Sequence, residues 1–406
     1  MSHKKTLATF FAAASFVANG VSANGHVLQV GKVSGYVTGQ SPQPSGIDYL
    51  SVQPKLLPQA IVPPASLLES LLQGQGGPVG VSSVSSGGTS KAAGNVNSVA
   101  PGFSPGNKGD GKLNPVFIQT PSSAAEKTSG AAAAVNQGNK SQITPADYGL
   151  GKQPFTTSRT DVGGANAKNF PYSAAGKLFY NEPSGSYVCS ASLIKRGLVV
   201  TAAHCVANFG KRQYYSGWQF VPGYDDSGVQ PYGIATAKTA YVLNSYLNGT
   251  DYCSNPGVAC QDDVAVIVLN TNIGNSAGWF GYAWNGYGNT VNNTNHITQL
   301  GYPAALDGGS WQERTDSQSY VSLTDANNTV IGSGQTSGSS GGPWLVNFGV
   351  EPAGETTNGA SSYNMVVGVT SWGYGTTVQQ QGASPFTSNN IVTLVNAACA
   401  AYPGAC

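Results

Sequence analysis

From residue 170 onward, short runs of apolar residues alternate with stretches rich in glycine, asparagine and proline. Residues 192–194 and 198–201 flank a polar turn, as the two strands of a hairpin would. Residues 264–269 and 366–372 are continuous apolar runs of the length of a buried strand. This pattern predicts an all-β body in the second half of the chain.

Near the end of the chain, the period of the apolar positions changes from that of strands to that of a helix. Ser388 precedes this stretch and is a residue typical of a helix N-cap. One face of the predicted helix carries Ile391, Val392, Leu394, Val395 and Ala398. We therefore expect a C-terminal helix that closes the all-β body.

Residues 24–160 differ in composition, because they are rich in Gly, Ser, Ala, Pro and Asn and show no sustained alternation of apolar and polar residues. This composition is typical of disorder, so we expect a low-complexity prosegment that is largely disordered. Residues 65–73 differ, since their leucines recur at the spacing of one helical face. They form either a short helix that docks on the second half or a marginal helix in a linker, because isolated helices this short are unstable in water.

The first 23 residues show the three parts of a secretory signal. His3, Lys4 and Lys5 form a positive start, residues 7–17 are apolar, and Val21-Ser22-Ala23 ends in small residues. A membrane anchor is the competing interpretation, but the apolar run is well short of the roughly 20 residues that span a bilayer. We therefore expect a signal peptide over residues 1–23 and a soluble, secreted, extracellular product.

Composition narrows the class of protein. The 406 residues exceed one average domain, so we expect one domain of roughly 200 to 250 residues and an additional segment. The 54 glycines and 23 prolines argue against a mostly helical fold. A formal net charge of +1 is too small for the basic surface that binds nucleic acid, so nucleic acid is not an expected partner. No stretch after the first 23 residues is long and apolar enough to span a bilayer, so a membrane is not expected either.

All six cysteines lie in the second half of the chain. An even number of cysteines in a secreted chain is typical of disulfides. Sequence alone allows many pairings, but the spacing favours Cys189 with Cys205, Cys253 with Cys260, and Cys399 with Cys406. No Cys-x-x-Cys pair is present, so we expect no zinc site and no cofactor.

Three segments of the second half carry side chains suited to acyl transfer. His204 ends an apolar strand, and a neutral imidazole is the usual base for activating a serine hydroxyl. Asp263 begins an apolar run and could orient that imidazole, with Asp262 as the alternative acid. Ser340 lies among glycines, where the amides of Gly338 and Ser340 could donate to an oxyanion.

These features also have structural interpretations. A single histidine or aspartate is common in turns, and a Gly/Ser stretch could be a linker, although the apolar residues 344–346 place this one inside the fold. The Gly-x-Ser-x-Gly pattern at 338–342 would also suit an esterase of the α/β-hydrolase type, whose histidine follows the serine. No histidine follows Ser340, which excludes that esterase. His296 lies in a turn-rich stretch and is expected to be structural or exposed.

Five motifs in sequence order resemble those of the chymotrypsin-like, or trypsin-like, serine proteases. The resemblance covers residues 170–406 and rests on Cys189-Ser190-Ala191-Ser192-Leu193-Ile194, Thr201-Ala202-Ala203-His204-Cys205, Asp263-Val264-Ala265-Val266, Gly338-Ser339-Ser340-Gly341-Gly342-Pro343 and Ser371-Trp372-Gly373. It implies a trypsin-like protease domain over residues 161–406, with two antiparallel six-stranded β-barrels. The active site would lie in the cleft between them, with His204 and Asp263 from the first barrel and Ser340 from the second.

The same resemblance implies a catalytic triad of His204, Asp263 and Ser340 that hydrolyses peptide bonds through an acyl-enzyme. The substrates would be proteins or peptides. We also expect a monomer and assign no metal ligands, although oxygen ligands for calcium from scattered loops would leave no short signature in the sequence. Because neutral imidazole is required, we expect activity to fall as His204 gains a proton below about pH 6 to 7.

One departure from the best-known members concerns activation. Ser339 stands where those enzymes carry an aspartate that pairs with the new N-terminus, so that charge pair cannot form here. A long prosegment still implies a zymogen that is activated by cleavage. Arg159 is a candidate processing point.

The residues expected to determine substrate specificity also differ from those of the known family members. Phe170-Pro171-Tyr172 and Gly301-Tyr302-Pro303 resemble the glutamyl endopeptidase branch, but Thr370 stands where that branch has a glutamate-binding histidine. Gly334 stands where trypsin has an acidic residue. The resemblance therefore implies a neutral polar pocket and a strand that pairs with the substrate backbone. The residues expected to bind substrate are Gly334, Gln335, Ser337, Thr370, Ser371, Trp372 and Gly373.

A binding or adhesion module that retains the protease fold without activity is the competing function. Such a module has no need of an intact set of His204, Asp263 and Ser340, nor of glycines around the serine. The complete set therefore favours the enzyme.

Overall fold

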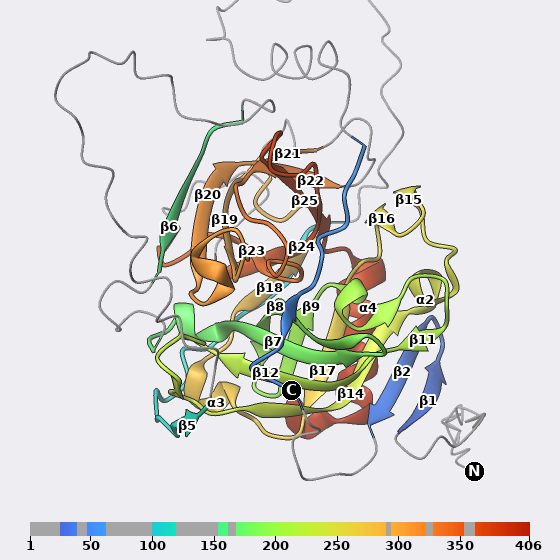
Figure 1. Ribbon diagram of the computed structural model, residues 1–406. Coiled ribbons are helices and arrows are strands. Elements are labelled where there is room, and N and C mark those ends of the chain that lie inside the picture. The colour runs from blue at the N-terminus through green and yellow to red at the C-terminus, as the bar shows by residue number, and fades with distance from the viewer. Residues whose placement is uncertain are drawn as a thin grey trace, which may run out of the picture.

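Figure 1 shows the computed structural model of the chain, which is mostly β. The structure describes residues 25–38, 47–61, 100–118, 153–160, 168–289, 294–321, 328–352 and 362–406. The predicted signal peptide and the leucine-containing segment at 65–73 lie outside these residues. Within the described part of the chain, no helix is both long and apolar enough to cross a membrane.

The first sheet closes into a barrel of six antiparallel strands, as predicted. The order is β14, β12, β7, β8, β9 and β17, and β17 returns to pair with β14. The predicted hairpin is formed by β8 and β9, with Ser192 opposite Val200. The six strands are β7 (Ala175–Glu182), β8 (Gly185–Lys195), β9 (Leu198–Thr201), β12 (Ser216–Pro222), β14 (Ala235–Leu243) and β17 (Ala265–Leu269).

The predicted apolar run at 264–269 is buried on both faces. Ile267 packs into the apolar cluster inside the barrel, whereas Val266 and Val268 pack into a second cluster that includes Leu345 of the other sheet and Leu394 of the C-terminal helix. A strand buried on both faces carries apolar residues without alternation, which explains the sequence pattern.

The second sheet curls into a half-barrel whose end strands do not pair with each other in the described residues. Its order is β21, β22, β25, β24, β23, β19, β20 and β6, and β18 pairs with β24. The predicted strand at 366–372 lies within β24. Bounds are β18 (Gly281–Trp284), β19 (His296–Gly301), β20 (Glu313–Gln318), β21 (Tyr320–Val321), β22 (Thr329–Gly332), β23 (Pro343–Val346), β24 (Met365–Gly373) and β25 (Gln380–Pro385).

The chain ends in the predicted helix, formed by a π-helical turn (Ser388–Val392) and α4 (Thr393–Ala401). Ile391, Leu394, Val395 and Ala398 are buried, and Val392 is partly buried. The predicted N-cap was wrong by one residue. Thr387 is the cap, because it has an extended backbone and its hydroxyl accepts from Asn390 N at 3.1 Å, while the Asn390 amide oxygen accepts from Thr387 N at 2.7 Å.

The three predicted disulfides are present. Cys189–Cys205 links β8 to the turn that carries His204, Cys253–Cys260 joins two short paired strands, and Cys399–Cys406 ties α4 to the last residue of the chain. No free cysteine occurs in the described residues.

Short elements complete the described structure. The remaining strands of the second half are β10 (Ala207–Asn208), β11 (Gln213–Tyr214), β13 (Val229–Gln230), β15 (Cys253–Asn255) and β16 (Val258–Cys260). The remaining helices are α2 (Asn244–Asn248), α3 (Gly274–Ala277) and 3₁₀ turns at Tyr172–Ala174, Ala203–Cys205, Asp307–Gly309 and Pro403–Ala405.

The described parts of residues 24–160 pair with strands of the second half of the chain, which their composition did not indicate. A hairpin of β1 and β2 joins β14, β3 pairs with β8, β4 with β18, β5 with β13, and β6 with β20. The predicted disorder of the other residues in this region falls outside the described chain. Bounds are β1 (Gly25–Val30), β2 (Val33–Thr38), β3 (Gln53–Pro54), β4 (Gly102–Ser104), β5 (Val116–Phe117) and β6 (Phe155–Arg159).

A lysine is buried at the start of β7. Lys177 is 7% exposed, donates to the Gly309 carbonyl at 2.8 Å and lies 4.5 Å from the centre of the Tyr224 ring. Burial lowers the pKa of Lys177 to about 8, although the charge of Asp226 opposes this shift. The folded chain therefore releases this proton at a lower pH than the unfolded chain does.

We expect Lys177→Met to remove part of the pH dependence of stability. Between about pH 8 and 10.5 the unfolded wild type holds the proton that the folded state has lost, so its free energy of unfolding rises with pH. A shift from 10.5 to about 8 corresponds to about 3 kcal/mol over that window. Denaturant unfolding of both proteins at pH 7.5 and 10.5 measures the difference. Equal changes in the two proteins would contradict the lowered pKa.

Candidate active site

His204 and Asp263 are joined by two hydrogen bonds. His204 lies in the 3₁₀ turn that follows β9, and Asp263 lies two residues before β17, the strand that pairs with β9. His204 Nδ1 is 2.8 Å from Asp263 Oδ2, and His204 N donates to Asp263 Oδ1 at 2.8 Å. A carboxylate only accepts, so Nδ1 carries the proton in this bond. In neutral imidazole this leaves the lone pair on Nε2.

Asp263 accepts a third hydrogen bond, which comes from the second sheet. The Ser371 hydroxyl, on β24, donates to Asp263 Oδ2 at 2.6 Å. Asp262, the alternative acid, points elsewhere, because its carboxylate accepts from Ser245 at 2.6 Å. Burial raises the pKa of Asp262, and the Ser245 hydrogen bond opposes that shift. The structure thus brings Asp263, and not Asp262, to His204.

The loop around Ser340 is held by backbone hydrogen bonds between the two sheets. The Ser340 carbonyl accepts from Ser190 N on β8 at 2.7 Å, and Gly341 N donates to the Thr370 carbonyl on β24 at 2.8 Å. Gly338 has φ of +90°, and a Cβ there would lie 2.6 Å from the Tyr302 carbonyl oxygen. This conformation and the lack of space favour glycine at this position.

Ser340 Oγ and His204 Nε2 have no hydrogen-bond partner in the described residues. Ser340 is fully buried and His204 is 6% exposed, yet neither Ser340 Oγ nor His204 Nε2 makes a hydrogen bond. Buried polar atoms are normally paired. An unpaired hydroxyl and an unpaired imidazole nitrogen are atoms that could exchange a proton with a reacting group.

Neutral side chains hold the residue before Ser340. The Ser339 hydroxyl donates to the Thr336 carbonyl at 2.7 Å and accepts from Gln381 Nε2 at 3.2 Å. Gln381 Nε2 also donates to the Gln335 carbonyl at 2.7 Å, and its amide oxygen accepts from the buried Gln299. This network supports the loop without the charge pair that Ser339 cannot form.

A cavity of about 400 Å³ is lined in part by residues 333–335, which precede the Ser340 loop in the chain. Of the residues predicted to bind substrate, Gly334 and Gln335 line it. Leu306 and Gln379 also line it, together with Phe155, Thr157, Ala305, Ser333, Gly375 and Thr376, and none of these side chains is ionisable. Phe155 and Thr157 belong to β6 and were missed, although an aromatic residue followed by two threonines is a strand signal.

The other residues predicted to bind substrate lie outside that lining. The Thr370 hydroxyl accepts from Gln299 Nε2 at 2.8 Å and from Trp344 Nε1 at 2.9 Å, so it is committed to the core. Trp372 is buried and donates to Asn328 at 3.2 Å. Ser337 and Gly373 instead contact residues 57–60 of the N-terminal region.

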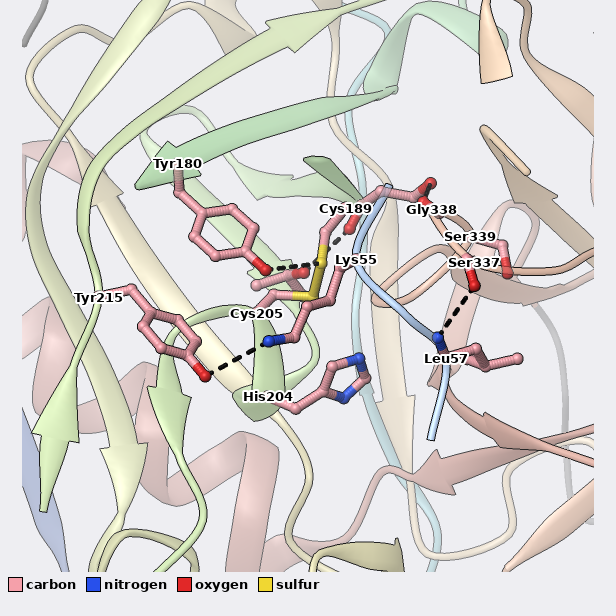
Figure 2. The surroundings of a disulfide bond; sticks show 12 residues. Lys55, Leu57, Tyr180, Cys189, His204, Cys205, Tyr215, Ser337, Gly338 and Ser339 are labelled. Carbon is pink, nitrogen blue, oxygen red and sulfur yellow. Dashed lines mark hydrogen bonds between the residues drawn. A yellow bond between two sulfur atoms is a disulfide. The ribbon is translucent and has the colours of Figure 1, made fainter. Parts of the chain in front are cut away.

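That N-terminal segment crosses the site between the two sheets (Figure 1). In Figure 2 it passes between the His204 imidazole and the loop of Ser337, Gly338 and Ser339. Gly338 N donates to the Lys55 carbonyl at 3.0 Å, and Leu57 N donates to Ser337 Oγ at 3.3 Å.

Arg159, the predicted processing point, is the last residue of β6. Its guanidinium lies 3.7 Å from the centre of the Trp311 ring, and Nη1 is 3.6 Å from Asp307 Oδ2. Cleavage at Arg159 stays a prediction. His296 is exposed at the start of β19, as expected.

One curated relative carries a name that implies a metal. The chain is 29% identical over 225 residues to the "Extracellular metalloprotease" of Bacillus subtilis (strain 168), which covers 53% of this chain and 65% of that protein. Two groups of described residues have ligand atoms close enough to hold an ion, and both contain a pair of cysteines. Those cysteines form the disulfides Cys189–Cys205 and Cys253–Cys260, so they have no thiolate to offer and do not fit a metal.

Solved structures of three proteases are similar to this chain. They are a thermostable serine protease from an extremophilic microorganism (22% identity, 56% of this chain and 96% of that chain, TM-score 0.45), the protease Anisep from Arthrobacter nicotinovorans (27%, 56% and 96%, 0.45) and a Glu endopeptidase (25%, 60% and 96%, 0.43).

The family model described as Trypsin matches residues 161–392, which is more than half of the chain. The match includes β7 to β25 and all three segments that carry His204, Asp263 and Ser340. The chain therefore belongs to the trypsin family.

Proposed function

We propose that this protein is a secreted endopeptidase that hydrolyses peptide bonds through an acyl-enzyme on Ser340. The observation that carries the proposal is the hydrogen bond between His204 and Asp263, together with a His204 Nε2 and a buried Ser340 hydroxyl that have no hydrogen-bond partner in the part of the chain that the structure describes. Secretion is supported by the predicted signal peptide at residues 1–23.

The proposed reaction has two halves. Ser340 Oγ attacks the scissile carbonyl carbon while its proton passes to His204 Nε2, and the C–N bond then breaks as that proton moves to the leaving amine. Water attacks the acyl-enzyme with the same assistance, which releases the acid and restores Ser340. Asp263 keeps the Nδ1 proton in place and stabilises the imidazolium during each half.

The amides of Gly338 and Ser340 are proposed to bind the oxyanion. The Gly338 N–H already donates to a peptide carbonyl, that of Lys55, which supports its suitability for this role. Gly334 and Gln335 would contact the side chain before the scissile bond, and residues 371–373 would pair with the substrate backbone.

A map of cleavage sites tests the proposal. The secreted wild type, a Ser340→Ala variant and a Ser184→Ala variant are each incubated with a mixed peptide library, and the cuts are identified by mass spectrometry. Ser184 is an exposed serine and serves as the matched control. We expect cuts with the wild type and with Ser184→Ala, and none with Ser340→Ala.

The same map measures specificity. Because no ionisable side chain lines the cavity, we expect uncharged residues before the cleaved bonds. An excess of Glu, Arg or Lys at that position would contradict the proposed pocket. Cuts that persist in Ser340→Ala would contradict the nucleophile. A folded, processed wild type that cuts nothing would favour the binding module.

A further inference from the structure

Residues 52–61 of the N-terminal region follow the substrate cleft along its length. At one end Lys55 N donates to the Val188 carbonyl on β8 at 2.9 Å, and at the other end Ala60 N donates to the Gly373 carbonyl on β24 at 2.9 Å. Between these points the Lys55 carbonyl accepts from Gly338 N at 3.0 Å. The segment therefore occupies both the proposed oxyanion donor and the strand proposed to pair with substrate.

The direction of this segment is opposite to that of a productive substrate. In the proposed reaction, the residues before the scissile carbonyl form the acyl half and lie along residues 371–373, next to the pocket. Here the carbonyl at Gly338 belongs to Lys55, but the residues along Gly373 are Pro58 to Ala60, which follow Lys55 in the chain. Gln59 pairs with Gly373 in a parallel bridge.

This reversal separates binding from hydrolysis. Gly373 forms hydrogen bonds with both of its backbone groups, because its N–H donates to the Pro58 carbonyl at 2.9 Å and its carbonyl accepts from Ala60 N. A reversed chain satisfies these backbone groups, but it places the residues that follow Lys55, and not those that precede it, along the strand proposed to hold the acyl half. Proximity without the reactive orientation yields no rate enhancement.

We propose that residues 52–61 are a built-in inhibitor that binds the substrate cleft in reverse and is therefore not cut. The proposal rests on the proposed function of Ser340. It identifies a second kind of ligand for the cleft, namely an extended peptide with prolines on both sides of a Lys-Leu-Leu core.

Side chains anchor the segment on both sides of the cleft. The Lys55 ammonium donates to the Glu182 carboxylate and, at 3.4 Å, to the Tyr215 hydroxyl, as Figure 2 shows for Tyr215. Leu57 is 5% exposed, and a Cβ at Gly373 would lie 2.9 Å from its Cδ2 atom. The neighbouring Leu56, in contrast, is 76% exposed.

This contrast between neighbours provides a matched pair of variants. Leu57→Asp places a carboxylate in the buried position, whereas Leu56→Asp places the same group in solvent. Each full-length chain, with its N-terminal region intact, is treated with a fluorophosphonate, which reacts with an accessible catalytic serine. The rate of covalent labelling is then followed by mass spectrometry.

We expect Leu57→Asp to be labelled at least about tenfold faster than the wild type. If the substitution lowers the equilibrium constant for binding of the segment in the cleft tenfold, the fraction of chains with an accessible serine rises about tenfold. Leu56→Asp should label at the wild-type rate. Ala60→Pro, which removes the N–H donated to Gly373, should also accelerate labelling and provides a second variant if Leu57→Asp fails to fold. Equal rates in the wild type and both cleft variants would overturn the inhibitor.

Failure of the underlying function gives a different result. If Ser340 is not the nucleophile, Ser340→Ala will label as fast as its parent, in the Leu57→Asp background as well. If Ser340 is the nucleophile but residues 52–61 do not inhibit, labelling will depend on Ser340 and will be fast in the wild type.

A peptide tests the direction of binding. A synthetic peptide of residues 52–61 is added to the Leu57→Asp chain, whose own segment is displaced. We expect it to slow labelling and to remain intact. A second peptide with alanine in place of Pro54 and Pro58 should also remain intact, since the direction and not the prolines protects it. Cleavage of either peptide after Lys55 would overturn the reversed binding.

Discussion

Replacing Asp263 with asparagine should lower kcat about 10⁴-fold while KM changes little. Asp263 Oδ1 accepts from the backbone N–H of His204, so the amide oxygen of asparagine would take that place. Its NH₂ group would then face His204 Nδ1, where Oδ2 now accepts. Nδ1 would become the acceptor and the proton would move to Nε2, which could no longer receive the proton of Ser340.

Asp262→Asn is the matched control for this experiment. The Asp262 carboxylate accepts from Ser245 and has no contact with His204 in the described structure, so its loss should leave kcat within about threefold. Steady-state kinetics on a peptide identified in the cleavage map would measure both variants. A large loss in Asp262→Asn together with a small loss in Asp263→Asn would reverse the assignment of the acid.

The second large effect concerns folding. Gly341→Ala should abolish accumulation of folded protein, because Gly341 has φ of +77° and an added Cβ would lie 2.0 Å from Thr201 Oγ1 and 2.5 Å from the Ser190 carbonyl oxygen. Both neighbours belong to the closed barrel, which cannot yield without loss of its own pairing. The cost should exceed about 4 kcal/mol, which is a large part of the stability of a domain.

Gly349→Ala separates the steric effect from the backbone strain. Gly349 has nearly the same φ, +70°, but a Cβ there would meet nothing within 4 Å. The strain alone should cost about 1 to 2 kcal/mol, so this variant should fold with a modestly lower melting temperature. Yield and thermal unfolding of the two variants provide the measurement. Equal destabilisation would show that the contacts of Gly341 are not the cause.

The sequence carries most of the information about the closed barrel and about the segments of His204, Asp263 and Ser340, because both depend on local patterns. The run at 264–269 is apolar throughout because both of its faces are buried, and the motif around Ser340 needs glycines for its backbone conformation. The N-cap was placed one residue late because Thr387 and Ser388 both carry hydroxyls and only the backbone conformation distinguishes them.

The residues that the sequence could not place are those whose partners are distant or are backbone atoms. Thr370 was predicted to face the substrate, but two buried side chains, Gln299 and Trp344, donate to its hydroxyl. The segment at 52–61 binds largely through backbone groups, which leave no signature in a sequence. The low-complexity sequence around it also suggested disorder, since composition reflects how many apolar residues a segment has and not which backbone hydrogen bonds it forms.

The strands of the N-terminal region also cover edges of the two sheets. β6 forms hydrogen bonds along β20, and the hairpin of β1 and β2 does the same along β14. If cleavage removes them, two rows of backbone donors and acceptors become accessible, and such open sheet edges are templates for association with other chains. While it stays attached, the N-terminal region would then also keep these two sheet edges paired and limit their association with other chains.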